Sequence, residues 1–124
     1  MNVLLATADS TLAAQFQAEL ESMGFTVLEA ADGSDALVAA GNSNPKLMLL
    51  DDTLPVFDGL TLAAMLRADP DLPAEVPLLL LAARDVEPHA LDAAGVDAVF
   101  PKAHGAADLR ERVTDLLARS GLLE

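Results

Sequence analysis

The sequence predicts an α/β fold with a five-stranded parallel sheet and helices on both faces. Short, continuous apolar runs alternate with longer stretches whose apolar residues recur at helical spacing. Parallel neighbours in a sheet need a crossover connection, and each helical stretch can supply one. The chain has 124 residues, an ordinary length for one domain. We therefore expect a single domain over residues 1–124.

The N-terminal half holds three of the predicted strands. Polar residues follow the first strand as candidate helix caps, and the helix after them repeats its apolar residues every four positions. Asp32 and Gly33 turn the chain after the second strand, Ser34 caps the next helix, and Gly41 with Asn42 ends it. The strands are Val3–Ala6, Phe25–Ala30 and Leu47–Leu50, the candidate caps are Asp9, Ser10 and Thr11, and the apolar repeat is Leu12, Phe16 and Leu20.

The C-terminal half holds two further strands and three helices. Asp58 and Gly59 turn the chain into a helix. The stretch Pro88–Ala94 has room for about two helical turns before Gly95, with proline acceptable at the first helical position. Because this helix is short, we expect the isolated domain to stay monomeric. The helix breakers are Pro70 and Pro73, the strands are Val76–Ala82 and Val96–Phe100, and the last helix buries Leu109, Val113, Leu116 and Leu117.

Composition excludes several classes of function. Twenty acidic and seven basic side chains give a net charge of −13, which repels nucleic-acid phosphates and anionic membrane surfaces. Cysteine is absent, which excludes disulfides and thiolate chemistry. No apolar stretch approaches the roughly 20 residues that span a bilayer. We therefore expect a cytoplasmic domain that binds neither nucleic acid nor membrane directly.

Acidic residues stand where the central strand ends. Asp51 and Asp52 directly follow the apolar run Leu47–Leu50, and Lys102 follows the fifth strand. Ligands of open α/β sheets bind beyond the carboxyl ends of the strands. The sequence therefore indicates a polar site at this edge of the sheet.

The motif around Asp51 resembles the third strand and following loop of response-regulator receiver domains. Pro55 stands four residues after Asp51 and is followed by the pair Asp58 and Gly59; similar segments continue through the chain to Lys102. The resemblance implies a flavodoxin-like (βα)5 three-layer sandwich with strand order 2-1-3-4-5. It also implies that Asp51 is the phosphoryl acceptor and that Lys102 is its catalytic partner.

The same resemblance implies partners and an activity class. A histidine kinase or phosphotransfer protein would supply the phosphoryl group, and an output domain or scaffold would receive the signal. The only chemistry expected of the domain itself is self-catalysed phosphoryl transfer onto Asp51, so we do not expect an enzyme.

Receiver domains normally hold Mg²⁺ with an acidic pair after the first strand, the acceptor, and a backbone carbonyl two residues after the acceptor. Here Asp51 and the Thr53 carbonyl are retained, but Thr7 and Ala8 occupy the acidic-pair positions. Asp9, one position further, is a weak candidate ligand that alternatively caps the first helix. We therefore expect Mg²⁺ to bind weakly or not at all, with impaired phosphorylation.

Further departures affect the positions that couple phosphorylation to movement. Ala82 stands where receivers carry a hydroxyl, and Val99 where they carry an aromatic switch residue, although Phe100 is adjacent. Ala103 replaces the proline that usually follows the lysine. We expect a trans peptide bond between Lys102 and Ala103, because a cis bond before a non-proline residue costs about 2.5 to 4 kcal/mol.

Some residues near the site keep two interpretations. Arg84 either neutralises Asp51 directly or is a solvated loop arginine, and Thr53 either modulates the phosphoryl lifetime or is a turn residue. We interpret Asp52 as a surface or capping residue, and His89 and His104 as surface histidines without metal-ligand spacing.

Three functional alternatives to a phosphorylatable receiver remain. The first is a pseudo-receiver that binds proteins without phosphorylation, which the losses at Ala82 and Ala103 favour. The second, remote alternative is a haloacid-dehalogenase-like hydrolase, which would need a second acid at Thr53. The third is a flavodoxin-like FMN carrier, which would need a Ser/Thr-rich phosphate loop after the first strand.

Overall fold

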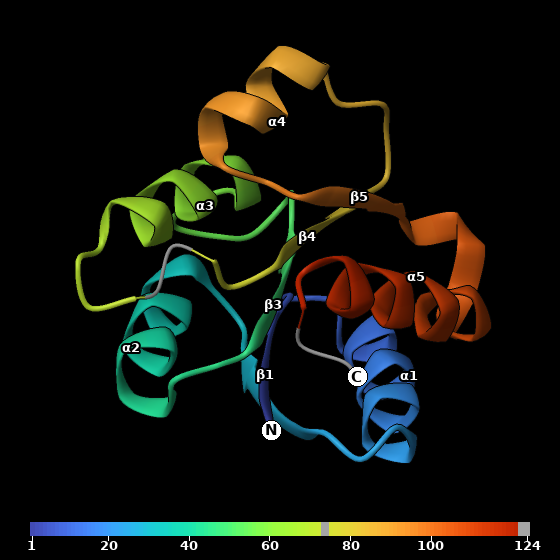
Figure 1. Cartoon of the computed structure of the whole chain (residues 1–124). Coiled ribbons are helices and arrows are strands. Elements are labelled where there is room, and N and C mark those ends of the chain that lie inside the picture. The colour runs from blue at the N-terminus through green and yellow to red at the C-terminus, as the bar shows by residue number, and fades with distance from the viewer. Residues whose placement is uncertain (73–74, 122–124) are drawn as a thin grey trace.

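The computed structural model describes residues 1–72 and 75–121. Within these ranges, five strands alternate with five α-helices, and a 3-10 helix follows the last strand (Figure 1). The elements are β1 Asn2–Ala6, α1 Ser10–Ser22, β2 Thr26–Ala30, α2 Gly33–Ser43, β3 Leu47–Asp51, α3 Gly59–Ala68, β4 Leu78–Ala82, α4 Pro88–Ala94, β5 Ala98–Pro101, η1 Lys102–His104 and α5 Gly105–Arg119.

The five strands form one parallel sheet in the order β2-β1-β3-β4-β5, which confirms the predicted order. The central strand β3 pairs with β1 and with β4, so that Leu49 lies between Leu5 and Leu79. All residues of β3 and β4 are buried. The continuous apolar runs in the sequence arise because these strands are covered on both faces.

Helices cover both faces of the sheet and form two cores. On one face, α1 and α5 pack on the sheet, and the rings of Phe16 and Phe100 meet edge to face with centroids 5.7 Å apart. On the other face lie α2, α3 and α4, where Leu62 and Leu66 of α3 share a buried core with Leu50 of β3. Figure 1 shows the sheet between these two layers. The predicted three-layer sandwich is therefore confirmed, including the buried apolar stripe of the last helix.

The predicted boundaries of α2 are wrong at both ends. Asp32, rather than Ser34, is the N-cap, because its carboxylate accepts a hydrogen bond from the Asp35 backbone nitrogen at 2.8 Å. Gly41 and Asn42 do not end the helix, which continues to Ser43 and terminates at Asn44 in the left-handed conformation.

Three strands begin later than predicted. The backbone nitrogen of Phe25 closes α1 by bonding to Leu20, and that of Val96 closes α4 by bonding to Leu91, so neither residue enters a strand. Pro77 has no N–H group to donate to a ladder, and β4 starts one residue after it. Pro73, predicted as a helix breaker, lies outside the described residues.

The fourth helix has the predicted extent, Pro88–Ala94, with proline in its first turn and Gly95 as a left-handed cap. Its effect on self-association stays a prediction. Among the described helices, none is long and apolar enough to cross a bilayer.

The loop after β3 contains a strained residue. Val56 has a φ of +72°, and the Phe57 backbone nitrogen donates to the Pro55 carbonyl oxygen at 2.9 Å, so Val56 is the central residue of a γ-turn with positive φ. A β-branched side chain is an outlier in this conformation. The Val56 side chain is also exposed, so burial does not offset the strain. The loop holds an unfavourable backbone next to the end of β3.

We expect Val56→Gly to raise the free energy of unfolding by about 1 kcal/mol, because glycine adopts positive φ without a Cβ clash. Urea denaturation followed by circular dichroism measures this. The matched control is Val38→Gly, an equally exposed valine inside α2, which should lower stability by about 0.5 kcal/mol. A loss of stability in Val56→Gly similar to that in the control would contradict the assignment of strain.

Candidate functional site

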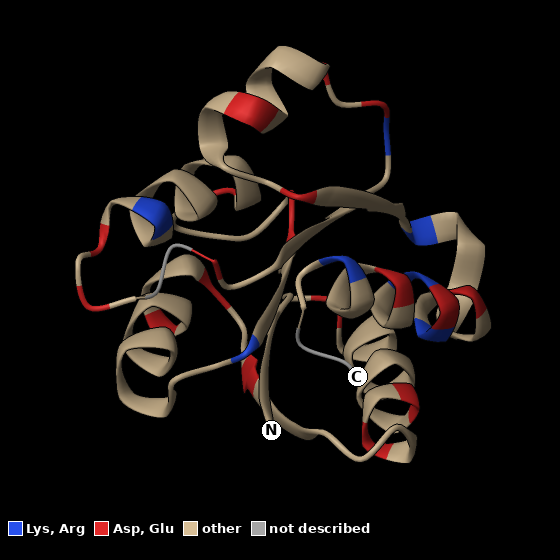
Figure 2. Ribbon diagram, viewed as in Figure 1, with Lys and Arg blue, Asp and Glu red and all other residues tan. Residues whose placement is uncertain are grey.

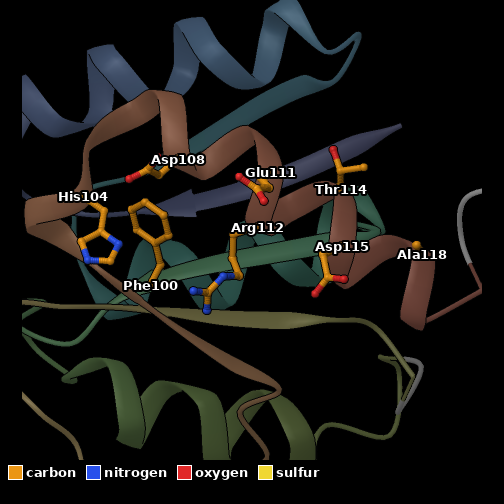
Figure 3. A pocket seen from close by; sticks show the side chains of 8 residues that line it. All are labelled: Phe100, His104, Asp108, Glu111, Arg112, Thr114, Asp115 and Ala118. Carbon is orange, nitrogen blue, oxygen red and sulfur yellow. The ribbon is translucent and has the colours of Figure 1, made fainter.

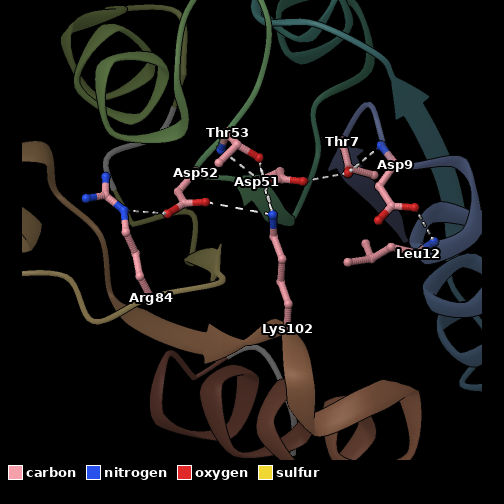
Figure 4. A network of polar contacts seen from close by, with 8 residues as sticks. All are labelled: Thr7, Asp9, Leu12, Asp51, Asp52, Thr53, Arg84 and Lys102. Atoms are coloured by element: carbon pink, nitrogen blue, oxygen red, sulfur yellow. Dashed lines mark hydrogen bonds and ion pairs between the residues drawn. The ribbon is translucent and has the colours of Figure 1, made fainter.

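The carboxyl ends of three strands bring Thr7, Asp51 and Lys102 together (Figure 4). Thr7 directly follows β1, Asp51 is the last residue of β3, and Lys102 directly follows β5. The start of α3 packs tightly against this edge: a Cβ on Gly59 would lie 2.5 Å from the Asp51 carbonyl oxygen. The end of the central strand is therefore fixed by its neighbours on several sides.

The Asp51 carboxylate is buried and surrounded by donors. The Thr7 hydroxyl donates to Oδ2 at 2.7 Å, whereas Oδ1 accepts from the Thr53 backbone nitrogen at 3.0 Å and from the Thr53 hydroxyl at 2.9 Å. The Lys102 ammonium nitrogen lies 2.5 Å from Oδ1. Asp51 is only 3% exposed, so water contributes little to its solvation. The protein itself solvates this charge.

These donors determine the ionisation of Asp51. Burial alone would raise the pKa of its carboxyl group, but hydrogen bonds from Lys102, the Thr53 backbone, Thr7 and the Thr53 hydroxyl together hold the pKa below its ordinary value. Asp51 is therefore a carboxylate at neutral pH, as a nucleophilic or metal-binding role requires.

Lys102 reaches Asp51 from η1 without a cis peptide bond. No cis bond occurs within the described ranges, which confirms the trans bond expected before Ala103. The Lys102 ammonium also donates to the Thr53 hydroxyl at 3.3 Å and lies 3.8 Å from Oδ1 of Asp52. One cation therefore serves two neighbouring carboxylates.

Asp9 is engaged as a helix cap. Its Oδ1 accepts hydrogen bonds from the backbone nitrogens of Thr11 and Leu12, both at 3.1 Å. Its own backbone nitrogen donates to the Thr7 hydroxyl at 3.1 Å. Its alternative role as a metal ligand stays a prediction.

The residues that could hold Mg²⁺ are Asp51 and the Thr53 carbonyl. Mg²⁺ requires near-octahedral oxygen coordination, usually with one or two carboxylates in place. In the described part of the chain, no group of three or more Asp, Glu, His or Cys side chains is placed to hold a metal ion. In addition, the Lys102 ammonium lies against the Asp51 carboxylate, where a metal ion would bind. This donor set fits Mg²⁺ poorly.

Asp52 does not take the predicted surface or capping role. It is only 7% exposed, because its backbone bonds to Leu81 on one side and to Gly59 on the other and so keeps the residue inside the sheet edge. The direct pairing of Arg84 with Asp51 is also wrong, since the Arg84 Nε lies 3.8 Å from Oδ2 of Asp52. Sequence reasoning missed Asp52 because a charged residue after a strand is usually exposed.

The predicted switch positions line a pocket. Ala82 ends β4 and Val99 lies in β5, and together with Arg84, Pro101 and Ala103 they border a hollow of about 360 Å³. Phe100 does not replace Val99, because its ring packs into the core under α1 and α5.

A second hollow of about 680 Å³ lies along α5 between Phe100, His104 and Arg112 (Figure 3), and Asp51 and its hydrogen-bond partners are not among its lining residues. Of its lining residues, Arg112 donates to the Val99 carbonyl oxygen at 2.9 Å. His89 and His104 are exposed, as predicted.

Comparison with known proteins identifies similar sequences and folds. A family model described as the response regulator receiver domain matches residues 3–114. The transcriptional regulatory protein PrrA of Mycobacterium tuberculosis is 36% identical over 122 residues, which cover 96% of this chain and 51% of PrrA. The chain thus spans about half the length of this curated relative.

Two solved structures extend the comparison. A putative response regulator from Chloroflexus aurantiacus is 30% identical with a TM-score of 0.85, covering 94% of this chain and 97% of that one. The receiver domain of the sensor histidine kinase PA1611 from Pseudomonas aeruginosa is 26% identical with a TM-score of 0.82, covering 94% and 97%. That structure contains a magnesium ion coordinated in its active site cleft.

The lowered pKa of Asp51 predicts a pH-dependent contribution to stability. A carboxylate with a lower pKa in the folded state stabilises the fold above the ordinary aspartate pKa of about 3.9. That stabilisation is lost as pH falls through the lowered pKa. We therefore expect the difference in unfolding free energy between the wild type and Asp51→Asn to shrink below about pH 4.

Urea denaturation followed by circular dichroism at several pH values measures this difference, since the chain has no Trp or Tyr for fluorescence. Asp85→Asn, which changes an exposed carboxylate, is the matched control. A wild-type advantage over Asp51→Asn that grows on acidification would contradict the lowered pKa.

Proposed function

The chain belongs to the response regulator receiver domain family, and we propose that it accepts a phosphoryl group on Asp51 slowly, with Lys102 rather than Mg²⁺ as the principal cation. Receiver domains are signalling domains of two-component systems, not enzymes. The observation that carries the proposal is the 2.5 Å contact between the Lys102 ammonium and the buried Asp51 carboxylate. It places a positive charge where negative charge develops during transfer.

The two oxygens of Asp51 differ in their readiness to react. Oδ1 is held by Lys102 and by both donors of Thr53, whereas Oδ2 has one hydrogen bond, from Thr7. We propose that Oδ2 attacks the phosphorus of a kinase phosphohistidine, so that an O–P bond forms, the N–P bond breaks, and the imidazole leaves and takes up a proton. Lys102 neutralises the acyl phosphate product.

Mg²⁺, where a receiver binds it, neutralises the equatorial oxygens of the transferred group. The missing acids at Thr7 and Ala8 leave this chain a poor donor set, so we propose weak or absent Mg²⁺ binding and slow transfer. Thr7 partly compensates for the missing acidic pair, because its hydroxyl donates a hydrogen bond that orients Oδ2 of Asp51 without adding negative charge.

A pseudo-receiver is the second candidate. Its support is that Ala82 and Val99 provide neither a hydroxyl nor an aromatic ring near the site. A phosphoryl group on Asp51 would therefore find no side chain at these two positions to shift the domain into a second conformation. Membership of the receiver family argues against a hydrolase and against an FMN carrier.

The proposed partners follow from the proposed chemistry. A histidine kinase or phosphotransfer protein in the cytoplasm would be the phosphoryl donor, and an output domain or a scaffold would read the result. The net charge of −13 supports contact through proteins rather than directly with nucleic acid.

Incubation with a small phosphodonor such as acetyl phosphate, followed by intact mass, tests the proposal. We expect slow addition of one phosphoryl group, with a rate that changes by less than about threefold when EDTA replaces Mg²⁺. Asp51→Asn should abolish the addition. Asp52→Asn removes the neighbouring carboxylate as a control and should still be phosphorylated. Rapid addition that depends on Mg²⁺ would refute the impaired metal site, and no addition would support the pseudo-receiver.

A further inference from the structure

Asp52 is a charged side chain buried without a hydrogen bond. Its side chain is 4% exposed, and neither carboxylate oxygen accepts a hydrogen bond from the described residues. Its backbone nitrogen donates to Leu81 at 3.0 Å and its carbonyl oxygen accepts from Gly59 at 3.2 Å, so its main chain is held at the end of β3. A buried carboxylate is strongly unfavourable unless cations lie close by. The charge of Asp52 therefore depends for its stabilisation on the neighbouring cations.

Two cations flank this carboxylate (Figure 4). The Lys102 ammonium lies 3.8 Å from Oδ1, and the Arg84 Nε lies 3.8 Å from Oδ2. Both distances exceed hydrogen-bond length, so the attraction is Coulombic. Lys102 has a closer partner in Asp51, whereas Arg84 makes no hydrogen bond within the described part of the chain. Arg84 is therefore the more loosely held of the two cations.

Arg84 also has room to move. Its side chain is 79% exposed and lies in the loop between β4 and α4. The pocket of about 360 Å³ beside it is lined mostly by small side chains, among them Ala82 and Ala103, together with Asp85. At the far end of the loop, the N-cap residue Glu87 makes no capping hydrogen bond through its side chain. The loop can therefore follow Arg84 without breaking such a bond.

We propose that Lys102 and Arg84 form a two-cation site for a phosphoryl group, and that Asp52 occupies both cations in the resting domain as an internal competitor. A phosphoryl group carries a charge of about −2 and three acceptor oxygens, and a guanidinium can bind two of these at once. Asp52 offers Arg84 a single contact at 3.8 Å. The biological use of the site rests on the proposed function of Asp51, but its affinity for an oxyanion does not.

Arg84 then links the site to the loop. When a phosphoryl group arrives, Arg84 leaves Asp52 for the phosphoryl oxygens and draws the β4–α4 loop with it. Lys102 remains close to Asp52, so the buried carboxylate keeps one counter-charge. This movement needs no hydroxyl at Ala82, so Arg84 provides a coupling that the residue at the end of β4 does not.

The test is titration of the full chain with inorganic phosphate, followed by the amide and Arg84 Nε–H signals in NMR spectra. Asp52→Asn should tighten phosphate binding about tenfold, because both cations lose their competitor. In an Arg84→Gln background, the same substitution at Asp52 should tighten phosphate binding by about twofold or less. Asp51 is present in every variant, so its repulsion of phosphate cancels in these ratios.

Asp85→Asn is the matched control. It removes one acidic charge from the same loop and, within the described residues, forms no ion pair with Lys102 or Arg84. It should change the affinity by less than about twofold. If Asp52→Asn does not fold, Asp52→Leu carries the same expectation, since it also removes the buried charge. The proposal would be overturned if loss of the Asp52 charge left the phosphate affinity unchanged. It would also be overturned if Asp52→Asn raised that affinity as much in the Arg84→Gln background as in the wild type.

This result is separable from the intact-mass experiment. An Arg84-dependent gain in phosphate affinity without phosphorylation of Asp51 would uphold the two-cation site and refute the proposed acceptor role. Phosphorylation of Asp51 without that gain in phosphate affinity would uphold the acceptor role and refute the two-cation site.

Discussion

The contact between Lys102 and Asp51 is the interaction around which the site is organised. It joins the end of β5 to the end of the central strand, and it sets a lysine ammonium 2.5 Å from a carboxylate that is 3% exposed. Two hydroxyls and one backbone nitrogen complete the environment of that carboxylate. An ion pair this buried persists because hydrogen bonds satisfy the remaining oxygen lone pairs.

The rest of the fold serves to hold this pair in place. The strands β3 and β4 are buried along their whole length between two helical layers, and the start of α3 presses against the end of β3. The acidic surface lies elsewhere: Figure 2 shows acidic residues over several helices and loops and few basic ones. Among the basic residues, Lys102 and Arg84 lie beside the acidic pair at the sheet edge. Net charge alone would not indicate their role.

Sequence reasoning predicted what depends on periodicity and chain direction. The five strands, their order through the family resemblance, the buried stripe of α5 and the trans bond after Lys102 are confirmed. Sequence reasoning missed the features that depend on loop conformation. Asp52 was expected on the surface, and its burial depends on backbone bonds to Leu81 and Gly59 that no local pattern reveals.

The positive φ of Val56 was equally hidden, because valine rarely adopts it. The boundaries of α2 failed for a related reason. Asp32 and Ser34 are both acceptable caps by composition, and only the hydrogen bond from Asp35 decides between them. Local sequence therefore determined the elements better than it determined how their ends are tied together.

If Lys102 takes the place of a metal ion, then its removal should create a metal site. Lys102→Met keeps the length of the side chain and leaves Asp51 and Asp52 without the ammonium they share. We expect this variant to bind Mn²⁺ at least about tenfold more tightly than the wild type, measured by water-proton relaxation on protein shown to be folded by circular dichroism. Wild-type protein that binds Mn²⁺ as tightly as Lys102→Met would contradict the view that the ammonium occupies the cation position.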